Sequence, residues 1–273
     1  MFQCSMSAKA RQKYKKKAKL RVRIQLFIVN LHKMKNKEGV FRFQRFSVRH
    51  DRCAMKVGTD GVLLGAWGCV EGDRILDIGT GTGLIALMAA QRNPDARVLG
   101  IDIDEAAVQQ ARENVAESPF HERVRCEVMD VMELRPTGRF DAILCNPPFF
   151  TEDTLPDDNA RALARNNKSL PFPLLIPKVA SMLNDKGTFS LIVPSTLAQE
   201  IVGLCLAEGL HLSRRCQVRT TKQKPPRRTL LEFTSDNQQS SVVSCQTTDL
   251  CLMDDEGGRS QAYKELTKDF YLY

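Results

Sequence analysis

Residue types that often mark a function are scarce in this sequence. Its 273 residues include one Trp and four His, and no histidine stands in a recognisable catalytic pattern. With 42% hydrophobic and 26% charged residues, the composition is too polar for a membrane protein. We therefore expect no membrane partner, and the length allows one large domain or two modest ones.

Paired cysteines are also missing. The nine cysteines are odd in number and form no C-x-x-C pair, which excludes a readable zinc knuckle or disulfide framework. Several of them, such as Cys145 and Cys205, lie within apolar runs, where a free thiol behaves as a small buried hydrophobe. We expect no metal ion, and a cytoplasmic location, because the cytosol keeps thiols reduced.

Acidic residues are absent from the first 37 positions, which hold 12 Lys and Arg residues. The rest of the chain carries 28 basic against 32 acidic residues, so the net charge of +8 arises in this segment. We interpret residues 1–38 as a disordered basic leader and residues 39–273 as one domain. The apolar stretch 20–31 does not indicate a secretory signal, because arginines interrupt it and no small-residue cleavage site follows.

From Arg74 onward, short apolar runs alternate with segments of helical periodicity. We predict strands at 74–79, 97–103, 123–130, 140–146, 187–194, 211–220 and 229–235, and helices at 84–92, 104–117, 174–183, 196–208 and 262–273. This order predicts an α/β fold with a doubly wound, mostly parallel, seven-stranded sheet that ends in an antiparallel hairpin. The hairpin connection, 221–228, is basic and contains two prolines, so we expect an exposed loop.

The segment DIGTGTG, which begins with Asp77, lies where the first strand ends and a helix begins. Glycines there let the backbone approach a ligand closely, and free N–H groups at the helix start add hydrogen-bond donors. The three glycines are Gly79, Gly81 and Gly83. Their spacing is associated with S-adenosylmethionine, but Gly81, Gly83 and Ala86 also satisfy the dinucleotide pattern G-x-G-x-x-A. We expect Asp77 and these glycines to bind a cofactor, whose identity the glycines leave open.

Two further aspartates follow predicted strands. Asp102 ends the second strand, 19 residues after Gly83, where a carboxylate can accept hydrogen bonds from both ribose hydroxyls of a nucleotide. Asp130 follows the third strand and is placed to accept a hydrogen bond from an adenine amino group. The structural alternatives are a helix N-cap at Asp104, a solvated Asp102 and a turn at Asp130. We favour cofactor binding for Asp102 and Asp130.

Asn146-Pro147-Pro148-Phe149 stand at the carboxyl end of the fourth strand, where ligands bind in open α/β sheets. One interpretation is a strand terminator, because proline stops the ladder. The chemical interpretation starts from a planar amine or amide nitrogen, which is a poor nucleophile. The Asn146 side-chain carbonyl and the Pro147 backbone carbonyl would accept hydrogen bonds from its two N–H groups. These bonds would favour the pyramidal form of the nitrogen, which attacks a methyl group. We predict Asn146, Pro147 and Phe149 as catalytic, with Asn146 also beside the cofactor and Phe149 stacked on the substrate.

Together, DIGTGTG, IDID and NPPF resemble the motifs of class I S-adenosylmethionine-dependent amino-methyltransferases. The segments 46–67 and 221–233 further resemble the bacterial tRNA(Val) adenine-N6-methyltransferases, which modify adenosine 37, directly 3′ of the anticodon. The resemblance covers residues 39–273. It implies S-adenosylmethionine as cofactor, tRNA as partner and N6-methylation of an adenine as the reaction.

The resemblance also assigns a role to KVGTDG (56–61). It implies that Lys56, Thr59 and Asp60 contact the methionine end of the cofactor. The same residues are typical of a turn, and this alternative stays open.

A tRNA substrate requires that the target adenine leave its stack, so we expect a flipped base that lies on Phe149. Basic residues near the predicted site would hold RNA phosphates. They are Arg161, Arg165 and Lys168 after the NPPF motif, and Arg214, Arg215, Arg219, Lys222, Lys224, Arg227 and Arg228 in and before the hairpin connection. For any one of them alone, a solvated surface charge is the better interpretation, and only the cluster favours RNA.

Other functions remain open at this point. A protein glutamine N5-methyltransferase presents a planar amide to the same two acceptors, but its peptide substrate does not require the basic loop. A non-catalytic RNA-binding relative would be free to lose Asn146. A dinucleotide dehydrogenase is a more distant alternative, because its reaction would not require the NPPF motif. We expect no obligate protein partner.

Overall fold

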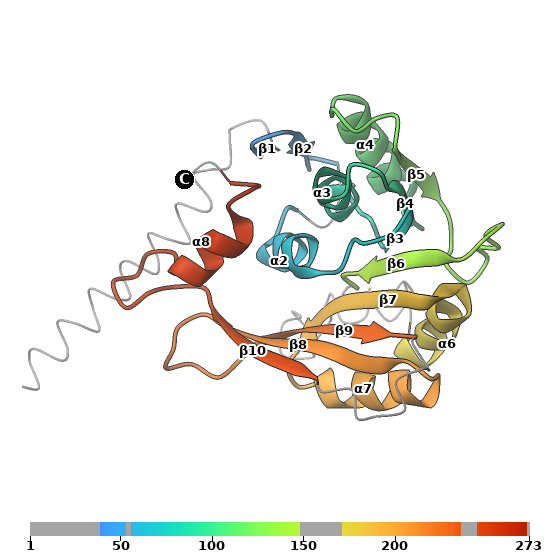
Figure 1. The fold of residues 1–273 in the computed structure, drawn as a ribbon. Coiled ribbons are helices and arrows are strands. Elements are labelled where there is room, and N and C mark those ends of the chain that lie inside the picture. Colours follow the sequence, from blue (N-terminus) through green and yellow to red (C-terminus); the bar gives the residue numbers. More distant parts are fainter. Residues whose placement is uncertain (1–38, 53–55, 148–170, 236–244, 272–273) are drawn as a thin grey trace, which may run out of the picture.

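A mixed eight-stranded sheet forms the centre of the protein (Figure 1). The computed structural model describes residues 39–52, 56–147, 171–235 and 245–271. The strands of the sheet are β3 (Arg74–Ile78), β4 (Arg97–Asp102), β5 (Val124–Val128), β6 (Phe140–Cys145), β7 (Leu183–Pro194), β8 (His211–Arg219), β9 (Arg228–Thr234) and β10 (Gln246–Cys251). In space they follow the order β10-β8-β9-β7-β6-β3-β4-β5.

The sheet has a parallel and an antiparallel half. From β5 to β7 in the spatial order, neighbouring strands run parallel to each other. β9 is antiparallel to both β7 and β8. β10 is parallel to β8. β3 and β6 are buried along nearly their whole length, as expected for parallel strands that helices cover on both faces.

Helices cover the two faces of the sheet (Figure 1). They are α2 (Thr59–Trp67), α3 (Leu84–Arg92), α4 (Glu105–Ala116), α6 (Phe172–Met182), α7 (Ala198–Ala207) and the C-terminal α8 (Gln261–Thr267). One apolar core includes Leu64 of α2 and Leu87 of α3 with Val98 of β4. The second includes Ile176 of α6 with Phe189 of β7. The alternation of side chains along each strand supplies both cores.

A short antiparallel pair, β1 (Val40–Arg42) and β2 (Ser47–Arg49), ties the start of the described chain to its end. The Gln44 Nε2 atom donates hydrogen bonds to the carbonyls of Lys268, at 2.7 Å, and Tyr271, at 2.6 Å. The Phe43 ring stacks on Tyr271 with 5.8 Å between centroids. Residues near position 40 therefore belong to the same packed unit as the C-terminal segment.

The predicted α/β fold with a doubly wound sheet and a terminal hairpin is confirmed, but the count of seven strands is too low. β10, the eighth, went unpredicted because its one buried residue is Leu250, so no alternation marks it. The segment 56–61 is not simply a turn, since α2 begins at Thr59. Residues 61–66 are all buried, and α2 therefore lacks the polar stripe that reveals most helices.

The predicted leader, residues 1–38, lies outside the described residues. Within the described ranges, no helix combines the length and the apolar character that crossing a membrane requires.

Candidate active site

The carboxyl ends of the parallel strands bring most of the predicted site residues to one edge of the sheet. Ile78 of β3 pairs with Cys145 of β6, so Gly79 and Asn146 leave adjacent strands side by side. On the other side of β3, Ile78 pairs with Ile101 of β4. Because ligands of open α/β sheets bind at this edge, the placement supports the predicted site.

The glycine-rich segment forms a turn that few other residues can adopt. Gly79, Gly81 and Gly83 have φ values of +71°, +53° and +80°. A Cβ atom at Gly79 would meet nothing within 4 Å, whereas one at Gly83 would lie 3.3 Å from the Ala111 Cβ of α4. Gly83 therefore permits close helix packing, and Gly79 leaves open space beside the turn for a ligand.

Asp77 is fully buried beneath this turn. Its Oδ2 atom accepts hydrogen bonds from the Thr80 hydroxyl, at 2.6 Å, and the Ala86 N–H, at 3.1 Å. Its Oδ1 atom is buried and has no hydrogen-bond partner in the described part of the chain. Desolvation raises the pKa of Asp77 to about 7, although the bonds from Thr80 and Ala86 oppose the shift. Asp77 thus fixes the turn and keeps one oxygen available to a donor.

Asp102 joins the end of β4 to the glycine turn. Its Oδ2 accepts from the Gly81 N–H at 2.9 Å, and its Oδ1 accepts from the Asp104 N–H at 3.0 Å. Each carboxylate oxygen has a second lone pair, so Asp102 still has acceptor capacity for hydroxyl groups. Asp104 is the N-cap of α4, which is the structural role predicted for it from the sequence. Its side chain accepts hydrogen bonds from the N–H groups of Ala106 and Ala107.

Two apolar side chains beside Asp102 are residues that the sequence analysis missed. Ile103 is 48% exposed, and Val128, which pairs with Asp102 across the strands, is 43% exposed. Exposed apolar side chains at the ligand-binding edge offer a surface to a planar base. The available signal was an apolar residue directly after a strand-end carboxylate.

Asp130 lies after β5, exposed, at the same edge of the sheet. Its Oδ1 accepts from the Met132 N–H at 2.9 Å, and its backbone carbonyl accepts from the Glu133 N–H. This is the turn that the structural alternative describes. The predicted contact of Asp130 with adenine stays a prediction.

Asn146 is half-buried at the end of β6, and its side chain makes no hydrogen bond to another described residue. The first turn of α2 packs beside it: a Cβ at Gly61 would lie 3.1 Å from the Leu84 Cδ2 and 3.9 Å from the Asn146 Nδ2. Pro147 is buried, whereas Pro148 and Phe149 lie outside the described residues. The structure thus places the Asn146 amide, which has no hydrogen-bond partner within the described ranges, beside the glycine turn and α2.

The predicted cofactor contacts before β3 lie at the start of α2. Lys56 is exposed just ahead of the helix, and Thr59 is its first residue and half-buried. Asp60 forms an ion pair with Arg228, in which the Arg Nε lies 2.7 Å from the Asp Oδ2. Asp60 is therefore engaged with β9 in this structure.

Residues 220–227, which we call the basic loop, connect β8 to β9 at the same edge, because Arg228 pairs with Pro194 at the carboxyl end of β7. Several of the predicted RNA-binding residues have acidic partners: Arg219 pairs with Asp249 at 2.7 Å and Lys222 with Asp255 at 3.7 Å. Lys224 and Arg227 are exposed, and neither side chain has an acidic partner among the described residues.

Arg214 does not belong to an open basic patch. It pairs with the buried Glu232, and its guanidinium lies 4.3 Å from the centre of the Trp67 ring. Glu232 also accepts from the Ser190 hydroxyl and the Cys69 N–H, both at 3.0 Å. Arg214 therefore joins the hairpin to the end of α2. Arg161, Arg165 and Lys168 lie outside the described residues.

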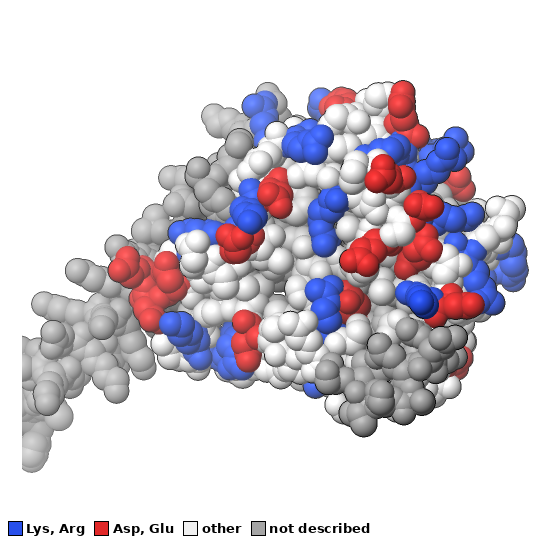
Figure 2. Space-filling view, viewed as in Figure 1, with Lys and Arg blue, Asp and Glu red and all other residues white. Residues whose placement is uncertain are grey.

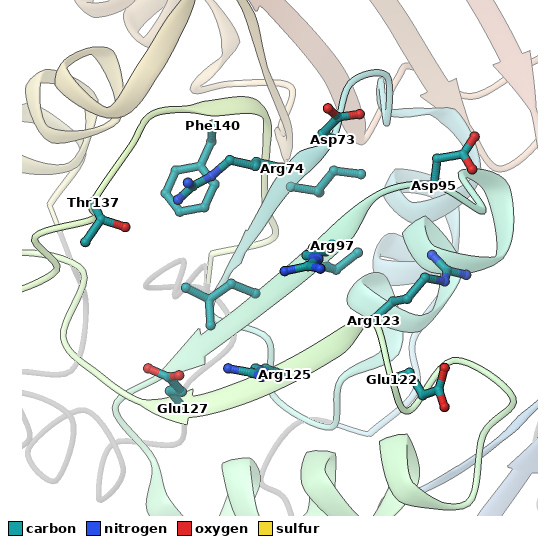
Figure 3. A pocket seen from close by; sticks show the side chains of 13 residues that line it. Asp73, Arg74, Asp95, Arg97, Glu122, Arg123, Arg125, Glu127, Thr137 and Phe140 are labelled. Carbon is teal, nitrogen blue, oxygen red and sulfur yellow. The ribbon is translucent and has the colours of Figure 1, made fainter.

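The surface charge agrees with this pairing. Figure 2 shows Lys and Arg interspersed with Asp and Glu over the face in view, so no broad single-sign field covers that face. A hollow lined by Arg74, Arg97, Arg125 and Phe140 lies near the amino ends of β3, β4 and β5 (Figure 3). It is at the opposite edge from Asp102, and no predicted site residue lines it.

Comparisons with known proteins agree with the geometry. Residues 58–171 match the family model "Methyltransferase small domain". A tRNA1(Val) (adenine(37)-N6)-methyltransferase from Bacteroides thetaiotaomicron is 43% identical over 85% of this chain and 97% of that protein. One from Vibrio cholerae is 38% identical over 88% of this chain and 98% of that protein.

The fold also occurs in a solved structure. A protein from Agrobacterium tumefaciens, described as a predicted O-methyltransferase, has a TM-score of 0.56 and 18% identity, covering 77% of this chain and 96% of that one. This likeness shows the fold, and the curated relatives show the family. The chain belongs to the tRNA1(Val) (adenine(37)-N6)-methyltransferase family, as the motifs implied.

Proposed function

We propose that this protein methylates the N6 atom of an adenine in tRNA, with S-adenosylmethionine as the methyl donor and adenosine 37 of tRNA(Val) as the target. The observation that carries the proposal is the place of Asn146. Its amide, without a hydrogen-bond partner in the part of the chain that the structure describes, lies beside the glycine turn at the edge of the sheet where ligands bind. The relatives of this chain are named as adenine N6-methyltransferases.

Several features at this edge fit S-adenosylmethionine. Gly79 borders open space, Asp102 keeps acceptor capacity for ribose hydroxyls, and Ile103 and Val128 offer an apolar surface to adenine. The buried, unpartnered Oδ1 of Asp77 suits a positively charged donor such as the cofactor's ammonium group. When bound, the cofactor supplies an electrophilic methyl group on a sulfonium. Together these residues bind and orient it.

Three more predicted contacts complete the cofactor site. Asp130 is exposed at the end of β5, where its second carboxylate oxygen would accept from the adenine amino group. Lys56 and Thr59, at the start of α2, would contact the methionine end. We assign no direct cofactor contact to Asp60, because its carboxylate pairs with Arg228.

The chain's own acceptors account for the reaction. The Asn146 Oδ1 and the Pro147 carbonyl accept hydrogen bonds from the two N–H groups of the adenine amine. These hydrogen bonds direct the nitrogen lone pair toward the methyl group. S-adenosylmethionine held at this edge would supply the methyl group to that nitrogen, giving up its carbon–sulfur bond as the nitrogen–carbon bond forms. The nitrogen then loses one proton to water. Because the proton leaves after transfer, no side-chain base is required.

Fewer basic residues are available to RNA than the sequence predicted, because several pair with carboxylates. Lys224 and Arg227 in the basic loop are the residues we assign to phosphate binding, since both are exposed and without an acidic partner in the described chain. An adenine stacked in an anticodon loop cannot reach the site, so the target base must flip out. Phe149 follows Asn146 in the sequence and would stack on that base.

The test is transfer of labelled methyl from S-adenosylmethionine to a mixture of cell RNA and protein. Nuclease digestion should release the label, and digestion of the RNA to nucleosides should yield N6-methyladenosine. Label that resists nuclease and is released by protease would indicate a protein glutamine methyltransferase instead. Purified tRNA(Val) with adenosine 37 replaced by guanosine serves as the matched control and should accept no methyl group.

A further inference from the structure

The Asp60–Arg228 ion pair connects two parts of the chain that are 168 residues apart. Asp60 lies in the first turn of α2, and Arg228 is the first residue of β9. The two side chains are 32% and 36% exposed, respectively. A pair this exposed contributes little to stability, so its position is more informative than its strength.

The arginine is fixed on its own side by the backbone. Its Nη1 donates to the Arg227 carbonyl at 3.2 Å, and that carbonyl also accepts from the Ser195 N–H at 3.2 Å. The Arg227 N–H donates to the Val218 carbonyl at 2.9 Å. Arg228 therefore projects from a hydrogen-bonded base of the basic loop, where β7, β8 and β9 come together.

The other end of the pair is one residue from the candidate active site. Gly61 follows Asp60, and the space where its Cβ would stand is bordered by Leu84, directly after the glycine turn, and by the Asn146 amide. The first turn of α2 has no side-chain cap, since its N-cap is Gly58. Within the described ranges, the Asp60–Arg228 ion pair is the polar side-chain contact that connects the first turn of α2 to β9.

We propose that Arg228 is a positioning residue: through Asp60 it holds the first turn of α2 against Asn146 and couples the basic loop to the reacting centre. This deepens the proposed function, on which it rests, and it replaces the predicted role of Arg228 as a phosphate contact. Arg227 is the matched neighbour. It is one residue away and exposed, and its side chain has no acidic partner in the described chain.

The experiment measures two quantities in Arg228→Ala and Arg227→Ala: the single-turnover rate of tRNA methylation at saturating tRNA and cofactor, and the salt dependence of tRNA binding. Arg228→Ala should lower the rate about tenfold or more and leave the slope of log K against log salt at the wild-type value. Arg227→Ala should weaken tRNA binding and reduce the magnitude of that slope by about 1.

Two further variants test the coupling. Arg228→Lys should recover part of the rate, since an ammonium group can still reach Asp60. Asp60→Ala should lose as much rate as Arg228→Ala, and the double variant should lose no more than either single one. Cofactor affinity from calorimetry and melting curves would show that each variant is folded.

The proposal is overturned if Arg228→Ala reduces the salt slope as Arg227→Ala does, because Arg228 would then contact phosphate. It is also overturned if the rate is unchanged, or if the losses at positions 60 and 228 add. Failure of the proposed function gives a different result, because the wild-type protein itself would then bind S-adenosylmethionine and methylate no tRNA. The proposed role of Arg228 would fail together with that function.

Discussion

The parallel and antiparallel halves of the sheet use their charged side chains differently. In the parallel half, the carboxylates of Asp77, Asp102 and Asp130 accept hydrogen bonds from the segments that follow β3, β4 and β5. In the antiparallel half, Arg214 and Arg219 pair with carboxylates across neighbouring strands. A strand-end carboxylate thus shapes a binding edge, whereas an arginine in a hairpin can serve the fold. Arg214 and Arg219 therefore cannot be counted as RNA contacts on their positive charge alone.

The largest expected effect lies in the parallel half, at Asn146. Asn146→Ala removes an acceptor that acts on the amine in the transition state, so kcat should fall by about 100- to 1,000-fold. Cofactor affinity from calorimetry should stay within about twofold, because little ground-state binding is lost. Asn146→Asp, which keeps an acceptor oxygen at this position, is the control and should retain more activity. Unchanged turnover in Asn146→Ala would remove the proposed role.

Substitution of Asp102 should affect cofactor binding, whereas substitution of Asn146 should affect the rate. Asp102→Ala removes acceptors for the ribose hydroxyls and the bond from Gly81, so the Kd for S-adenosylmethionine should rise about 10- to 100-fold. Asp104→Ala, which removes only the cap of α4, serves as the neighbouring control. Wild-type cofactor affinity in Asp102→Ala would contradict the ribose assignment.

Asp77 should make stability depend on pH. Its pKa is about 7 in the folded protein against 3.8 for the free group, so between about pH 4 and 7 the folded state holds a proton that the unfolded chain has released. The free energy of unfolding should therefore fall as pH rises through this interval and level off above it. Urea titrations at pH 5 and pH 8 should show a smaller fall in Asp77→Asn. Parallel falls in both proteins would contradict the assignment.

The last comparison is between two ion pairs of the antiparallel half, one of which should have the smallest effect of all. Glu232→Ala leaves Arg214 without its partner next to Trp67 and should cost about 2 to 3 kcal/mol of unfolding free energy. Asp249→Ala removes an exposed partner of Arg219 and should cost less than about 0.5 kcal/mol. Chemical denaturation of both variants makes the comparison, and equal costs would refute the distinction.

The sequence predicted features that local backbone geometry dictates. The glycine turn was predicted because a positive φ demands glycine. The position of Asp102 at a strand end was predicted because strand ends in a βαβ unit have a known spacing, and its contact with ribose stays a prediction. α2 was missed because its buried glycines and leucines have no polar face. β10 was missed because it buries only Leu250.

Pairing between distant residues left no trace in the sequence. Asp60 and Arg228 meet only because β9 begins at the edge where α2 starts. Arg214 was predicted to bind RNA because the register that sets Glu232 opposite it could not be derived from the length of the connection. Ionic partners across the sheet therefore require the three-dimensional structure.

The most direct measurement is a structure of the protein with S-adenosylhomocysteine and an anticodon stem-loop that contains the target adenosine. We predict the adenine N6 within about 2.7–3.2 Å of both the Asn146 Oδ1 and the Pro147 carbonyl, with the cofactor sulfur on the far side of that nitrogen. A sulfur atom remote from Asn146, with no space between them for a base, would contradict it.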